Sequence, residues 1–143
     1  MRVMGLDLGE RRIGVAISDP LGITASGVEV IQRAGLVQDL ARLGALIREN
    51  EISEVVVGLP RHMNGSLGEA AQKVQEFAGM LQARLKEEGL APRFTFWDER
   101  LSTVAAQRVL LEGDMSRARR KQVVDKVAAA IILRSYLDSR RRV

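Results

Sequence analysis

The chain has 143 residues, of which 46% are hydrophobic, and it contains no cysteine. This length and composition fit one domain with a hydrophobic core and exclude a disordered chain, while the lack of cysteine excludes disulfides, thiolate metal sites and cysteine nucleophiles. The formal net charge is +4, and residues 117–143 carry nine basic and two acidic residues. A basic end on a mildly acidic body favours a phosphate-rich partner, although a solvated helix with an arginine tail explains the same charges.

Neither a secretory signal nor a membrane span is expected from this sequence. The N-terminal segment reaches the charged residue Asp7 too early for a signal peptide. No later apolar run is long enough to cross a bilayer. We therefore expect one domain over residues 1–143 that resides in the cytoplasm and has no membrane partner.

The first part of the chain predicts three consecutive antiparallel strands. Their apolar, β-branched segments cover residues 3–8, 12–18 and 23–31. The connections at residues 9–11 and 19–22 are hairpin-length, whereas a parallel crossover needs a dozen or more residues. The spacing then becomes helical, with leucines and one isoleucine three or four residues apart at Leu36, Leu40, Leu43 and Ile47.

The rest of the chain alternates strands with helices. Residues 54–59 contain three consecutive valines, which is typical of a strand covered on both faces. Ser66 and Glu69 match a capping box that opens a second helix with Leu67 on its apolar stripe, and Gly89 closes that helix. The remaining expected elements are a strand over 93–97, a helix from 102 or 103 to about 112, and a helix over about 117–138. These connections predict an α/β fold with a mixed five-stranded sheet, antiparallel at first and then parallel, and helices on both faces.

Acidic residues at two strands are candidates for a functional site. Asp7 lies within an apolar strand, where a carboxylate is costly unless it is paired or binds a cation; a hydrogen bond to the Gly9 turn is the structural alternative. Asp98 and Glu99 directly follow the fifth strand, at the sheet edge where ligands gather in α/β folds. Because successive strand side chains alternate in direction, we expect only one of this pair to enter a given site, although both could be solvated loop residues.

A third candidate, Asp125, lies on the last helix. It shares a helix face with small alanines that would let the backbone approach the sheet, and an exposed ion pair with Lys121 is the alternative. Together, Asp7, Glu99 and Asp125 could hold Mg²⁺ or Mn²⁺, which prefer oxygen ligands. Two such ions ~4 Å apart activate water and stabilise the leaving oxygen of a phosphodiester. This chemistry needs no histidine, so the single His62 is expected to be a loop residue or a phosphate contact.

Four motifs resemble those of the YqgF (RuvX) family: GLDLG with RIGVA at residues 5–9 and 12–16, GLP with MNGS at 58–60 and 63–66, DERLST at 98–103, and DKVAAA at 125–130. The resemblance covers essentially the whole chain. It implies a ribonuclease H-like fold related to Holliday junction resolvases and a nuclease role in maturation of the 16S ribosomal RNA precursor. Carried over to this sequence, the acidic metal-binding positions of the family are Asp7, Glu99 and Asp125.

We therefore expect a metal-dependent nuclease whose partner is nucleic acid, with an RNA precursor as the first substrate and branched DNA as the second. A non-catalytic nucleic-acid or ribosome-binding factor is the alternative, but a pure binder of polyanions gains nothing from clustered acids. The first motif also resembles the phosphate loop of sugar kinases, Hsp70 and actin. Those proteins place ATP between two such domains, so we expect no ATP binding here. The sequence has no dimer signature, which favours a monomer or weak dimer.

Overall fold

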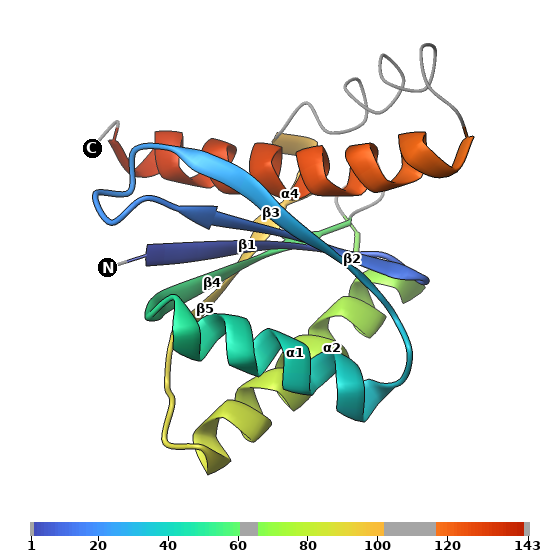
Figure 1. Cartoon of the computed structure of the whole chain (residues 1–143). Helices are drawn as coiled ribbons and strands as arrows, with labels where there is room; N and C mark the ends of the chain where they lie inside the picture. Colours follow the sequence, from blue (N-terminus) through green and yellow to red (C-terminus); the bar gives the residue numbers. More distant parts are fainter. Residues whose placement is uncertain (1, 61–65, 102–116, 142–143) are drawn as a thin grey trace.

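Five strands form one sheet in the order β3-β2-β1-β4-β5 in the computed structural model (Figure 1). The structure describes residues 2–60, 66–101 and 117–141, and in the last range it describes side chains for residues 127–140. The strands are β1 (Arg2–Leu8), β2 (Arg12–Ser18), β3 (Ala25–Gln32), β4 (Ile52–Leu59) and β5 (Arg93–Asp98).

Strand direction follows the lengths of the connections. β1 pairs antiparallel with β2, and β2 with β3, while β4 runs parallel to both β1 and β5. The first connection is a tight hairpin in which the Gly9 N–H donates to the Arg12 carbonyl at 2.9 Å. Each later crossover contains a helix, as parallel pairing requires. The predicted mixed sheet, antiparallel and then parallel, is confirmed.

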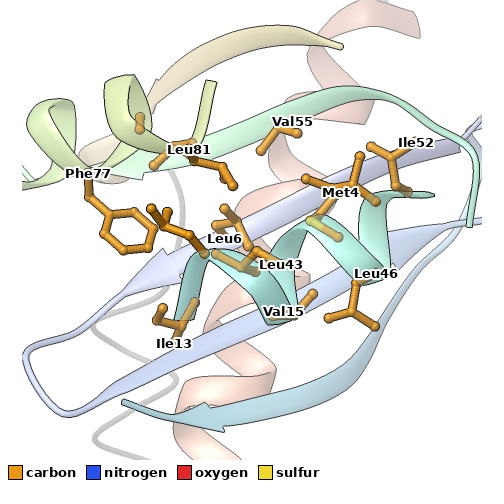
Figure 2. Close-up of a cluster of buried hydrophobic side chains, with 14 of the residues drawn as sticks. Met4, Leu6, Ile13, Val15, Leu43, Leu46, Ile52, Val55, Phe77 and Leu81 are labelled. Carbon is orange, nitrogen blue, oxygen red and sulfur yellow. The ribbon is translucent and has the colours of Figure 1, made fainter. Parts of the chain in front are cut away.

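Helices cover both faces of the sheet (Figure 1). α1 (Leu36–Glu49) and α2 (Glu69–Glu87) lie on one face, and α4 (Arg117–Arg141) lies across the other. Between the sheet and the first two helices, alternate strand residues and helix leucines form the larger core, which Figure 2 shows around Met4, Leu6, Val15, Leu43 and Leu81. The three valines of β4 are fully buried, so this strand is covered on both faces as predicted.

The opposite core is smaller and brings α4 unusually close to the sheet. Ala128 and Ala129 are buried there, as their small size predicted. A methyl group at Gly5 would lie 3.0 Å from the Ala129 carbonyl oxygen and 2.8 Å from Leu133 Cβ. The helix backbone therefore rests on the bare backbone of β1, where Gly5 faces Ala129 and Leu133 of α4.

A buried carboxylate joins the amino end of β4 to α4. Glu54 is 5% exposed and accepts hydrogen bonds from Thr95 Oγ1 at 2.8 Å, Tyr136 Oη at 2.6 Å and Arg140 Nη1 at 3.0 Å. Burial and the hydrogen bond to Glu54 raise the pKa of Tyr136, so its phenol stays protonated and donates. These contacts fix the C-terminal half of α4 against the sheet.

Two predicted boundaries were wrong. The third strand begins at Ala25 because Asp19 Oδ1 accepts hydrogen bonds from the Ile23 and Thr24 N–H groups, at 2.7 and 2.8 Å, which keeps them in the turn. The second helix begins at Glu69 after a Gly68 N-cap that makes no side-chain cap hydrogen bond.

The predicted capping box of the second helix is therefore incorrect, because Glu69 stands at the first helical position instead of the third. Leu67 precedes the helix and is 42% exposed. Gly89 does follow the helix end, with a positive φ of 77°. The helix expected between residues 102 or 103 and 112, and His62, lie outside the described residues. Within the described ranges, no helix combines the length and apolarity needed to cross a bilayer.

Candidate active site

Asp7 lies near the carboxyl end of β1 on the face that α4 covers. Side chains two residues apart on a strand share a face. Gly5 contacts α4, so Asp7 belongs to the same face. The residue is only 7% exposed. A carboxylate buried in the centre of a sheet is costly unless its oxygens are hydrogen-bonded or balanced by positive charge, and this makes Asp7 an unusual residue for a purely structural strand.

Glu99 reaches the same face from the end of β5. It is the first residue of a short 3₁₀ helix, η1 (Glu99–Leu101), which directly follows the strand. A methyl group at Gly58 would lie 2.9 Å from Glu99 Oε1 and 2.6 Å from Ile132 Cδ1 of α4. The Glu99 carboxylate therefore lies over the bare backbone of β4, next to α4, in space that any larger residue at position 58 would fill.

The register of the sheet brings these two acids together. Leu6 of β1 pairs with Val57 of β4, so the next step along both strands sets Asp7 beside Gly58, the residue that Glu99 covers. Asp7 and Glu99 thus flank Gly58 at the carboxyl edge of the parallel strands. Sequence reasoning named both acids but assigned no role to Gly58. Two signals marked this residue: it opens the GLP motif at 58–60, and it is a glycine at the end of a valine-rich strand, which is typical of a close backbone approach.

Asp98 has a different environment from its neighbour. Its carboxylate accepts hydrogen bonds from the Arg100 backbone N–H at 2.9 Å and from Arg100 Nη2 at 2.6 Å. The preceding residue, Trp97, faces α4, because its ring packs on Tyr136 at a centroid distance of 5.5 Å. Since side chains alternate along a strand, Asp98 lies on the opposite face of the sheet. The geometry separates the two acids: Asp98 binds its own turn and Glu99 faces α4.

Asp125 lies on the backbone of α4, and its side chain is outside the described set. From Ala129, which contacts Gly5, the helix continues to Tyr136, which contacts Glu54 at the amino end of β4. Position 125 is one turn before Ala129 on the same helix face, about 6 Å nearer the carboxyl end of β1. Figure 1 shows this end of α4 above the β1–β2 hairpin.

No three acidic or histidine side chains form a metal-binding group among the residues whose side chains are described, a set that includes Asp7 and Glu99 but not Asp125. The donor set that is described consists of carboxylate oxygens, which suit hard divalent cations such as Mg²⁺. Both acids stand at the sheet edge where α/β folds bind their ligands. The arrangement fits a cation site that would be completed from α4.

The strand order, the parallel and antiparallel pairing and the helices on both faces define a ribonuclease H-like α/β fold. Two solved structures share it at low sequence identity. Thermus thermophilus RuvC in complex with a Holliday junction substrate matches with a TM-score of 0.61 at 18% identity, covering 99% of this chain and 96% of that one. The fowlpox virus Holliday junction resolvase matches with a TM-score of 0.56 at 16% identity, covering 97% and 99%.

The chain belongs to the RuvX family, described as Holliday junction resolvase, whose model matches residues 1–139. Relatives from two bacteria carry the name "Putative pre-16S rRNA nuclease". The protein of Moorella thermoacetica is 59% identical over 138 residues, covering 96% of this chain and 95% of the relative. That of Syntrophomonas wolfei is 54% identical over 138 residues, covering 96% and 94%.

Proposed function

We propose that this protein is a metal-dependent nuclease that hydrolyses phosphodiester bonds, with Asp7, Glu99 and Asp125 as the ligands of Mg²⁺ or Mn²⁺. The observation that carries the proposal is the pair of carboxylates, Asp7 and Glu99, flanking Gly58 at the carboxyl edge of the sheet. In a protein that only binds polyanions, negative charge at this place would weaken the binding. A cation site, in contrast, needs that charge.

The geometry supports specific tasks for the chain's own residues. Asp7 and Glu99 would offer oxygen ligands from two strands of a rigid sheet, and Asp125 would add a third from the helix packed on it. Ile132 lies against Gly58 and keeps the inner side of the site apolar. A divalent cation held by these residues would stabilise charge on the phosphate and would lower the pKa of water for attack.

The substrate proposed first is the precursor of 16S ribosomal RNA. Relatives that are more than half identical over nearly the whole chain carry that name. A four-way DNA junction is the second candidate, because the family is described as a Holliday junction resolvase. Both substrates present phosphodiesters to the same carboxylates, so the proposed chemistry is the same for both. They would differ in the protein surface that binds them.

The proposal is tested by offering the purified full chain two labelled substrates, a 16S rRNA precursor and a four-way DNA junction, each with Mg²⁺, Mn²⁺ or a chelator. We expect cation-dependent cleavage of the RNA precursor. Cleavage of the junction alone would assign the second substrate. Binding of either substrate without cleavage at any cation concentration would show a non-catalytic binding factor and overturn the nuclease proposal.

The basic C-terminus is proposed to contact phosphates, and Arg140 makes structural contacts in addition. Arg140 pairs with the buried Glu54 and lies over the Tyr136 ring at 5.6 Å, so it also holds α4 in place. We expect replacement of Arg141 and Arg142 by alanine to weaken nucleic-acid binding regardless of sequence. Each lost phosphate contact should lower the slope of log affinity against log salt by about 0.7 to 0.9.

Arg140→Ala is the comparison for this prediction. It should lower the midpoint of urea unfolding, because Glu54 stays buried but loses a cationic partner. The Arg141 and Arg142 variants should unfold like the wild type. Salt titrations of binding by fluorescence anisotropy check the first effect. An unchanged slope in the Arg141 and Arg142 variants would show that these arginines only form a solvated surface.

A further inference from the structure

One hydroxyl group of α4 contacts both sides of the turn that carries Glu99. Ser135 Oγ accepts a hydrogen bond from Trp97 Nε1 at 3.1 Å and donates one to the Leu101 carbonyl oxygen at 3.1 Å. A serine hydroxyl has one donor and two acceptor positions, so it can serve both partners at once. Trp97 precedes Glu99 by two residues and Leu101 follows it by two.

These contacts constrain the short turn between β5 and Leu101 on both sides of Glu99. η1 is a single short turn, and Leu101 is 62% exposed, so apolar packing of its side chain does little to anchor it. The edge-to-face contact of Trp97 with Tyr136 fixes the strand side of the turn, and the Ser135–Leu101 hydrogen bond fixes the far side. Glu99 lies between the two fixed points.

We propose that Ser135 is a positioning residue that holds the Glu99 carboxylate over Gly58, at the place where the cation would bind. Ser135 lies on the same helix as Asp125, so one hydroxyl group ties the turn that carries one proposed ligand to the helix that carries another. This inference rests on the proposed metal-dependent function. Groups that orient metal ligands without touching the metal typically change metal affinity by about 10- to 100-fold when they are removed.

The test uses Ser135→Ala in the full chain. Alanine has the higher helix propensity, so α4 should persist. Trp97 is the only tryptophan of the chain, and it can sensitise the luminescence of Tb³⁺ bound at the neighbouring site. We expect Ser135→Ala to raise the Kd for Tb³⁺, taken from the titration midpoint, and the Kd for Mn²⁺, measured by calorimetry, by about 10-fold or more. The Mg²⁺ concentration for half-maximal cleavage should rise in parallel.

The chain offers a matched control on the same helix. The Ser139 hydroxyl donates to the Tyr136 carbonyl within α4 at 2.7 Å, so Ser139→Ala removes a serine hydroxyl without touching the Glu99 turn. Ser139→Ala should bind both cations like the wild type, and Ser135→Thr should restore most of the affinity because it restores a hydroxyl. Trp97→Phe keeps a ring but removes the N–H donor, and it should weaken Mn²⁺ binding in the same direction.

The outcomes separate this inference from the function on which it rests. Wild-type protein that neither binds Mn²⁺ nor cleaves nucleic acid would defeat the proposed function, and the role of Ser135 with it. Wild-type protein that does both, together with a Ser135→Ala variant of unchanged metal affinity, would defeat the positioning role alone. An equal loss in Ser135→Ala and Ser139→Ala would also defeat it, because that result would reflect a general effect on α4.

Discussion

Replacing Asp7 by Asn or Glu99 by Gln is expected to reduce phosphodiester cleavage by orders of magnitude while the fold persists. Each change keeps the size of the side chain and removes a negative charge that a divalent cation needs. In metal-free buffer, stability should be unchanged or higher, because clustered carboxylates repel one another and Asp7 is buried. Asp125→Asn should behave in the same way. Single-turnover cleavage and urea unfolding, measured on the same preparations, check both halves of the prediction.

Asp98→Asn is the internal control for these variants. Asp98 differs from Glu99 by one position in the chain, but its carboxylate is bound by Arg100. Its replacement should cost much less activity than Glu99→Gln. The reverse order, a harmless Glu99→Gln and an inactive Asp98→Asn, would show that the faces of the two acids have been assigned wrongly. Lower stability with activity lost only through unfolding would point to structural ion pairs instead of a cation site.

Gly58→Ala is expected to impair cleavage nearly as severely, although it adds one methyl group and changes no charge. That methyl group would lie 2.9 Å from Glu99 Oε1 and 2.6 Å from Ile132 Cδ1, closer than atoms in contact can approach. Since β4 is buried at the centre of the sheet, the side chains must move, and Glu99 is displaced from Asp7. Overpacking of this kind costs about 1–3 kcal/mol of stability, so the folded protein should survive. Metal affinity and cleavage rate are the quantities to measure.

Gly79→Ala provides the same chemical change in open space. Gly79 lies in α2, and apart from the adjacent residues and backbone of α2 itself, a methyl group there would meet no heavy atom of the described residues within 4 Å. Alanine in a helix interior should raise stability by roughly 0.5–1 kcal/mol and leave cleavage unchanged. Full activity in Gly58→Ala would mean that Glu99 does not need its position over β4, and the proposed site would lose its geometric basis.

Much of the fold could be predicted because local patterns and tertiary packing agree in this chain. Short connections forced the first three strands into an antiparallel meander, and the valine run of β4 indicated a strand covered on both faces. Two predicted boundaries differ from the structure. The Asp19 turn delayed β3, and the second helix began after Gly68 instead of at the Ser66 pattern.

The candidate site could be predicted less completely, for a physical reason. Acids in apolar strands stand out in a sequence because burial of a carboxylate is costly. The groups that position them do not stand out, because their role depends on contacts between distant segments. Gly58 matters through the register that sets it beside β1 and under Glu99, and Ser135 through hydrogen bonds to residues more than 30 positions away. In the sequence, Glu54 looks like an ordinary charged residue, and the structure shows that Tyr136 and Arg140 bind it.

The most direct measurement of the central claim is a crystal structure of the protein grown with Mn²⁺, in which anomalous scattering locates the ion without reference to activity. We expect Mn²⁺ within direct coordination distance of oxygens of both Asp7 and Glu99, with a third carboxylate from Asp125, and loss of the anomalous peak in Glu99→Gln. A peak elsewhere on the molecule, or full occupancy at this site in Glu99→Gln, would contradict it.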